Sequence, residues 1–244
     1  MNTSMTQALP RELRLRRQGS VLRLPAKIAN HRLSFIVDTG SECTIVPLEI
    51  VQRLGLERYI DKSDEYSYEN TVGRLMLDIV CEGGVRLQGY ILVDYPTSGE
   101  LLLGMDILHS YSCSILQKPY RPSLVVREAH SFPSLTEAWT VNISIGSVTL
   151  PAVLDTGSTD TYMPSHVARE LGLKVEDSAE ENVLLSSGKY MCVSKVARAV
   201  NIVLNGRHFC VDVSVEDDER EVLIGQNILR HCDMHFTQAG LLTQ

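Results

Sequence analysis

The chain has 244 residues, which is enough for one large domain or two small ones and excludes a larger assembly of domains. Hydrophobic residues make up 44% and charged residues 22% of it, with 16 Gly and 9 Pro, and this composition is typical of a globular protein. The net charge of −7 argues against a nucleic-acid partner. No apolar run reaches the roughly 18–20 residues that cross a bilayer, so we expect no membrane partner either.

The first twenty residues are polar and basic. Arg11, Arg14, Arg16 and Arg17 lie among them, and no apolar stretch of the kind found in a secretory signal peptide follows. We therefore predict that residues 1–20 form an N-terminal tail or pro-segment. We expect the protein to be cytoplasmic or to be released from a larger precursor.

An internal repeat organises the rest of the chain. Residues 35–47 read FIVDTGSECTIVP and residues 152–164 read AVLDTGSTDTYMP, so Asp38 and Asp155 occupy equivalent positions 117 residues apart. In each copy a Pro follows the Asp loop and a Leu-Gly-Leu follows the Pro. Because Pro suits the first turn of a helix and Gly its end, each copy predicts a helix of two to three turns, over residues 47–56 and 164–173.

The remaining segments read as short strands. Residues 75–80 and 85–93 flank Gly83-Gly84, and residues 196–204 and 208–215 flank Asn205-Gly206, which predicts two hairpins. Each half then ends in an apolar segment with a central Gly, LLLGMDIL at 101–108 and VLIGQNIL at 222–229. The pattern predicts a mostly β protein. A Pro-rich junction places the boundary near Ser131, with a first half over 21–130 and a second over 131–244.

The six cysteines are spread singly through a chain that is large enough to fold without disulfides. We expect reduced, mostly buried thiols. No clustered Cys or His spacing suggests zinc, so we expect no metal and no cofactor.

One Asp-Thr-Gly sequence is weak evidence of function, because an ordinary turn produces the same letters. Two copies in matching surroundings predict a pair of carboxylates on a pseudo-twofold axis. Two carboxylates held about 3 Å apart share one proton, so one can act as a base and the other as an acid. Such a pair can remove a proton from a water molecule while it polarises a peptide carbonyl.

The residues beside each Asp have expected supporting roles. We expect Gly40 and Gly157 to permit a tight turn that brings a backbone N–H to each carboxylate. Thr39 and Thr156 are expected to form hydrogen bonds across the axis. Each serine hydroxyl is expected to donate to the carboxylate of its own half, which would lower the pKa of the pair; the serines are Ser41 and Ser158.

The segments that carry Asp38 and Asp155, together with the apolar-Gly segments, resemble the retropepsin branch of aspartic proteases. They are similar to the protease domains of long-terminal-repeat retrotransposons and of DNA-damage-inducible ubiquitin-receptor proteases. The resemblance covers roughly residues 21–244. It implies two retropepsin-like lobes fused into one pseudo-twofold chain, with short helices after each Asp loop and each apolar-Gly segment. It also implies that Asp38 and Asp155 are the catalytic pair of an aspartic endopeptidase acting on a peptide or protein substrate.

Two alternatives remain at this level. The chain could be a non-catalytic binding or scaffold module on a protease fold, although such a module has no need for two Asp-Thr-Gly-Ser loops. It could also act only as a homodimer of two chains, whereas we favour a monomer with an internal pseudo-dimer.

Retropepsins close over substrate with glycine-tipped hairpin flaps, and the two halves of this chain differ there. In the second half the flap position falls near Ser187, Gly188 and Lys189. The matching segment of the first half, residues 61–70, has no Gly and is part of a stretch seven residues shorter, so we predict that the second half supplies the main lid. Two tyrosines of that shorter segment, Tyr66 and Tyr68, are candidates for contact with substrate.

Overall fold

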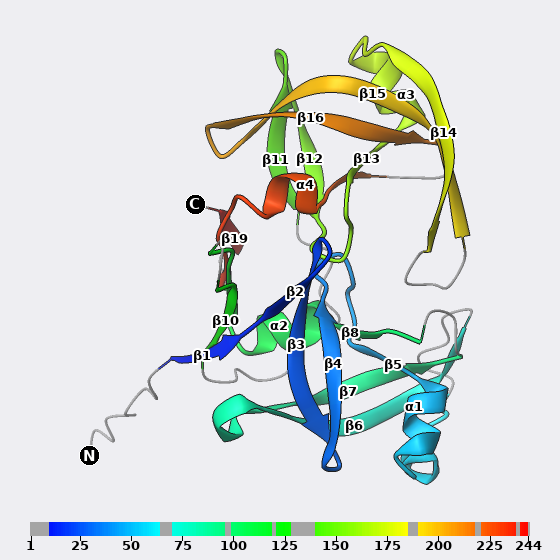
Figure 1. Ribbon diagram of the computed structural model, residues 1–244, viewed down its shortest axis with the longest axis vertical. Helices are drawn as coiled ribbons and strands as arrows, with labels where there is room; N and C mark the ends of the chain where they lie inside the picture. Colours follow the sequence, from blue (N-terminus) through cyan, green and yellow to red (C-terminus); the bar gives the residue numbers. More distant parts are fainter. Residues whose placement is uncertain are drawn as a thin grey trace.

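The computed structural model describes residues 10–63, 70–95, 99–118, 121–127, 140–184, 190–217, 221–237 and 240–243. Strands dominate these residues, as predicted, and they form three sheets (Figure 1). The boundary near Ser131 and all five flap and substrate candidates lie outside the described residues; these candidates are Ser187, Gly188, Lys189, Tyr66 and Tyr68. Within the described ranges, no helix has the length and apolar character needed to cross a membrane.

The first half forms a seven-stranded sheet. Its strands in spatial order are β2 (Arg16–Gln18), β3 (Val21–Ile28), β4 (His31–Val37), β8 (Leu101–Leu103), β5 (Ile45–Pro47), β7 (Arg86–Asp94) and β6 (Thr71–Cys81). Strand β3 also pairs with β6 through Ala26 and Cys81, so the sheet bends back on itself. Strands β6 and β7 form the first predicted hairpin, which turns through a short 3₁₀ helix, η3 (Glu82–Gly84).

The second half forms a sheet with the same order of strands. They are β11 (Thr140–Ile145), β12 (Val148–Leu154), β17 (Val222–Ile224), β13 (Thr161–Pro164), β16 (Arg207–Glu216), β15 (Tyr190–Leu204) and β14 (Val175–Leu184). Strands β15 and β16 form the second predicted hairpin, in which Asn205 and Gly206 both have positive φ, as a type I′ turn requires. Six strands of each sheet correspond, while β2 is extra in the first half and β14 in the second.

A third sheet joins the two halves. Its five strands are β1 (Arg11–Arg14), β10 (Ser123–Val126), β9 (Ser114–Leu116), β18 (Met234–Thr237) and β19 (Gly240–Thr243). The halves meet where Ile115 on β9 pairs with Met234 on β18, and both side chains are fully buried. In Figure 1 the second half lies above the first, and this sheet runs between them along one side. One cluster of buried apolar residues extends from Leu13 to Met234 and includes residues of both halves.

The N-terminal segment differs from a disordered tail. Residues 11–18 supply strands β1 and β2, and Leu13 and Leu15 are each only 2% exposed. The sequence did not predict these strands because short strands with alternating Arg gain their stability from pairing partners far away in the chain. Residues 11–18 of the predicted N-terminal tail or pro-segment are therefore ordered and belong to the fold.

The helices are shorter than the sequence predicted. Helices α1 (Leu48–Arg53) and α3 (Ser165–Glu170) have six residues each, which is less than two turns. A Pro directly precedes each helix. A Gly of positive φ lies two residues after the last helical residue, Gly55 after α1 and Gly172 after α3. Helices α2 (Met105–Ser110) and α4 (Gln226–Leu229) begin directly after the glycine of each apolar-Gly segment, and a 3₁₀ turn, η1 (Glu57–Tyr59), follows α1.

Candidate active site

The two Asp loops occupy equivalent positions at the ends of strands β4 and β12. The backbone N–H of Asp38 donates to the carbonyl of Leu103 at 3.0 Å, and that of Asp155 donates to Ile224 at 2.9 Å. Each apolar-Gly segment therefore passes directly behind an Asp loop. Position 104 requires a glycine because an added Cβ would overlap the backbone carbonyl of Cys43.

The fold brings the two carboxyl groups together across the axis between the halves. A Cβ added to Gly40 would stand 2.5 Å from Cγ of Asp155, and a Cβ added to Gly157 would stand 2.7 Å from Cγ of Asp38. Each glycine thus lies against the carboxyl group of the opposite half. Neither glycine has a positive φ, so these positions need Gly for space and not for an unusual backbone conformation.

The two threonines form the expected crossed hydrogen bonds. The backbone N–H of Thr39 donates to Oγ1 of Thr156, and the N–H of Thr156 donates to Oγ1 of Thr39, both at 3.0 Å. Each hydroxyl also donates across the axis, from Thr39 to the carbonyl of Leu154 at 2.5 Å and from Thr156 to that of Val37 at 2.6 Å. Both threonines are buried, so these bonds fix the distance between the two loops.

Asp155 is surrounded by three hydrogen-bond donors from its own loop. Its Oδ1 accepts the backbone N–H of Gly157 at 2.8 Å and of Ser158 at 3.1 Å, and its Oδ2 accepts the Ser158 hydroxyl at 2.7 Å. This is the arrangement that the sequence predicted. Three donors favour the charged form of a carboxyl group.

Asp38 lacks the matching serine bond, and here the prediction was wrong. The hydroxyl of Ser41 donates to the carbonyl of Cys43 at 2.8 Å, while the backbone N–H of Gly40 donates to Oδ1 of Asp38 at 3.0 Å. A Ser hydroxyl can bond to the backbone two residues further on, and at Ser41 this local acceptor takes the place of the carboxylate.

The environment of Asp38 favours its protonated form. The residue is only 6% exposed. Burial raises the pKa of Asp38 well above its ordinary value, and the charge of Asp155 and a hydrogen bond with its carboxyl group raise it further. The N–H groups of Gly40 and Ser41 oppose this rise without cancelling it. The arrangement can therefore hold a proton on Asp38, which shares a hydrogen bond with the carboxyl group of Asp155.

A small apolar cluster, apart from the main core, lies within electrostatic reach of Asp155. Tyr162 on β13 and Val193 on β15 are buried there, and Val183 and Leu223 pack against them. Burial raises the pKa of Tyr162 to about 12, and the nearby charges of Asp160, Glu181 and Asp155 contribute. Tyr162 was not among the residues predicted for the site. Its equivalent in the first copy of the repeat is Ile45, so the signal was an aromatic residue in place of an aliphatic one.

The second half has a long hairpin next to the expected flap position. Strands β14 and β15 pair as far as Leu184 and Tyr190, on either side of residues 185–189. In the first half, the described part of the corresponding segment makes one isolated bridge, between Asp61 and Arg74. The two halves therefore differ where the flaps were expected.

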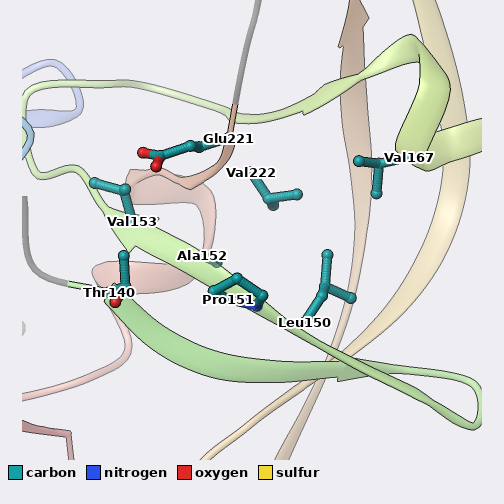
Figure 2. Close-up of a pocket in the computed structure, with 8 residues that line it drawn as sticks. All are labelled: Thr140, Leu150, Pro151, Ala152, Val153, Val167, Glu221 and Val222. Carbon is teal, nitrogen blue, oxygen red and sulfur yellow. The ribbon is translucent and has the colours of Figure 1, made fainter.

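A separate apolar cavity of about 170 Å³ lies in the second half (Figure 2). Val167 on α3 stands at one end of it, and Thr140 and Glu221 stand at the other. The rest of its lining comes from strands β12 and β17, namely Leu150, Pro151, Ala152, Val153 and Val222. Neither Asp38 nor Asp155 lines this cavity, so it is distinct from the carboxyl pair.

Each half of the chain matches a known protein family. Residues 24–110 and 141–231 each match the family model described as "gag-polyprotein putative aspartyl protease". Protein DDI1 homolog 1 from Homo sapiens is 30% identical over 105 residues, which are 40% of this chain and 26% of that protein, so the chain spans about a quarter of the length of this relative.

Two solved structures are also similar. One is the retroviral protease-like domain of Ddi1 from Leishmania major, with a TM-score of 0.35 and 21% identity over 41% of this chain and 80% of that one. The other is the EIAV protease complexed with the inhibitor HBY-793, with a TM-score of 0.32 and 20% identity over 38% of this chain and 85% of that one.

Proposed function

The chain belongs to the gag-polyprotein aspartyl protease family, and from that premise we propose that it is an aspartic endopeptidase whose halves each supply one catalytic residue, Asp38 and Asp155. One observation carries the proposal. Each carboxyl group lies against the Asp-Thr-Gly glycine of the opposite half, so the pair is assembled between the halves of a single chain.

The unequal hydrogen bonding of the pair supports a division of roles. Asp155, with three donors, is suited to be the charged base, and Asp38, buried with a raised pKa, is suited to be the acid. Asp155 would take a proton from a water molecule as the water oxygen attacks the peptide carbonyl carbon, and Asp38 would give its proton to the carbonyl oxygen. When the C–N bond of the resulting tetrahedral intermediate breaks, the proton held by Asp155 would pass to the departing amine, and a hydroxyl of the intermediate would return a proton to Asp38 as the carbonyl re-forms.

The proposed substrate is an extended peptide with apolar residues near the cleaved bond. Extended peptides bind to strand edges through their main chain, and side-chain pockets supply specificity. The cluster of Tyr162, Val193, Val183 and Leu223, within electrostatic reach of Asp155, would supply apolar side chains on that side of the site. The long β14–β15 hairpin would close over such a substrate, and the first half would contribute a smaller lid.

The proposed active form is a monomer. The sheet that joins the halves is built within one chain, through the pairing of β9 with β18. Sedimentation of active material should therefore give the mass of one chain, 27.2 kDa, and specific activity should not change on dilution. A mass of two chains, with activity that falls on dilution, would instead identify the homodimer.

The proposed activity is tested with a peptide library at several pH values, using the intact protein and the single variants Asp38→Asn and Asp155→Asn. We expect cleavage by the intact protein, inhibition by a statine-type transition-state mimic, and loss of at least about 10³-fold in kcat for each variant, with cooperative thermal unfolding retained. Full activity in either variant would exclude a single carboxyl pair. If the intact protein binds peptides without cleaving them at any pH, the scaffold alternative holds.

A further inference from the structure

A buried side-chain amide distinguishes the second Asp loop from the first. Gln226 is the first residue of α4 and is 1% exposed, and its Nε2 donates to the backbone carbonyl of Thr156 at 3.1 Å. Thr156 directly follows Asp155. The first half has Met105 at the equivalent position, fully buried and without a hydrogen-bond donor. Only the second Asp loop is therefore held by this polar contact.

A second buried amide continues the path away from the loop. Gln117, 4% exposed, follows β9 of the sheet between the halves, and its Nε2 approaches Oε1 of Gln226 at 3.5 Å. The backbone N–H of Gln117 also donates to Asp233 at 2.6 Å, which fixes the position of this residue.

The path ends on the N-terminal strand β2. Nη2 of Arg17 donates to Oε1 of Gln117 at 2.7 Å, and Nη1 of the same side chain donates to the carbonyl of Ser20 at 3.3 Å. Three side chains therefore connect the N-terminal segment with the loop that holds Asp155. Arg17 and Gln117 lie 100 residues apart in the sequence, and Gln117 and Gln226 lie 109 residues apart.

The direction of this path is set by both of its ends. A guanidinium group has donors only, so Arg17 requires the oxygen of the Gln117 amide to face it. The carbonyl of Thr156 is an acceptor only, so it requires the NH₂ of Gln226 to face it, and the oxygen of Gln226 then faces the NH₂ of Gln117. Without Arg17 the oxygen of Gln117 loses its charged donor, and its amide is held in this path only by the 3.5 Å contact with Gln226.

We propose that Arg17, Gln117 and Gln226 form a positioning relay that fixes the Asp155 loop, and that strand β2 is therefore part of the working molecule and not a removable segment. All three are positioning residues, because they act through Thr156 and do not touch substrate. The kinetic part of the proposal rests on the proposed protease function. Its structural part does not, since the loop and the relay exist in the free protein.

The experiment compares Arg17→Ala and Gln226→Met with a matched control, Arg16→Ala. Arg16 lies beside Arg17 on β2 and is exposed, and Met is the residue that the first half carries at the position of Gln226. We expect Arg17→Ala and Gln226→Met to shift the backbone amide resonances of Thr156, Gly157 and Ser158, and Arg16→Ala to leave them unchanged. Arg17→Lys keeps a cationic donor and should restore most of the original shifts.

Kinetics provide the second measurement. Loss of loop positioning should lower kcat by about tenfold with KM within about twofold, and the double variant Arg17→Ala/Gln226→Met should be no worse than either single variant. Unchanged loop resonances in a folded Arg17→Ala variant, or effects of Arg17→Ala and Gln226→Met that multiply, would overturn the relay. If the intact protein cleaves no peptide, the proposed function fails, while the amide resonances still decide on the relay.

Discussion

The carboxyl group of Asp155 lies against Gly40 of the opposite half, so close that an added Cβ would stand 2.5 Å from its Cγ. Real Cβ atoms do not approach a carbon atom so closely, and the neighbouring atoms are those of a catalytic candidate held by three hydrogen bonds. We expect Gly40→Ala to displace Asp155 and to lower kcat by about 10²-fold or more, because misplacement of a catalytic group by about 1 Å has this effect. Gly157→Ala should act in the same way on Asp38.

The control for these variants is Gly146→Ala. Gly146 has a φ of +59° with open space around it, so Ala there costs about 1 kcal/mol of backbone strain at a site away from both Asp loops. We expect Gly146→Ala to lower the melting temperature slightly and to leave kcat unchanged. If Gly40→Ala behaved like Gly146→Ala, the close contact between the halves would be wrong.

The two serines should affect the pH dependence of cleavage differently. Ser158 donates its hydroxyl to Asp155, whereas Ser41 donates its hydroxyl to Cys43, so of the two hydroxyl groups only that of Ser158 stabilises a carboxylate of the pair. We therefore expect Ser158→Ala to move the acidic limb of the pH–rate profile upward, and Ser41→Ala to leave it in place. Equal shifts in the two variants would contradict the unequal pair.

Asp38 should reduce the stability of the protein at neutral pH. Burial raises the pKa of Asp38 above its value of about 3.9 in the unfolded chain. The unfolded chain therefore loses this proton first as the pH rises, and stability falls from about pH 4 up to the pKa of the folded protein. Asp38→Asn removes this effect, so we expect a higher melting temperature at pH 7 and no difference near pH 3. Each kcal/mol recovered corresponds to about 2–4 °C.

Asp61→Asn is the control with the opposite sign. Hydrogen bonds from Ser63 and Arg74 lower the pKa of Asp61, so this exposed carboxylate adds stability above its unfolded pKa and loses it as the pH falls through its folded pKa. Its removal should lower the melting temperature slightly at pH 7, and thermal melts from pH 3 to pH 8 measure both variants. A gain at pH 7 for Asp61→Asn as large as that for Asp38→Asn would show that the effect comes from net charge and not from burial.

Sequence reasoning predicted the parts of the site that the repeat itself encodes. Two copies of one loop related by a pseudo-twofold axis must place equivalent residues across that axis. Asp38 therefore lies opposite Asp155, and Thr39 is hydrogen-bonded to Thr156, as expected. The hydroxyl of Ser41 could not be predicted in this way, because its choice between two acceptors depends on local backbone geometry. The difference from Ser158 lies in the acceptor of the hydroxyl group, which the repeat does not encode.

The N-terminal strands and the relay were missed for a different reason. The side chains of Arg17 and Gln117 are hydrogen-bonded although they lie 100 residues apart in the sequence, and no local pattern marks such a pair. A signal was nevertheless present at Gln226, where the second copy has a buried amide in place of Met105 of the first. A polar residue at a position where its repeat partner is apolar requires a hydrogen-bond partner, and a search for one leads to Gln117.

The unequal hairpins should respond differently to an inhibitor. In the second half β14 and β15 pair up to Leu184 and Tyr190, while the described part of the first-half segment offers one bridge, between Asp61 and Arg74. A lid that has closed over a bound ligand opens less often than the lid of the free protein, so hydrogen exchange of its amides slows in proportion. With a statine-type inhibitor we expect exchange at Val183 and Leu184 to slow by about tenfold or more, and exchange at Asp61 and Arg74 to slow by less than about threefold. Val200 and Val211, paired at the far end of β15 and β16, supply the reference that should not change. Equal protection in the two halves would contradict a principal lid from the second half.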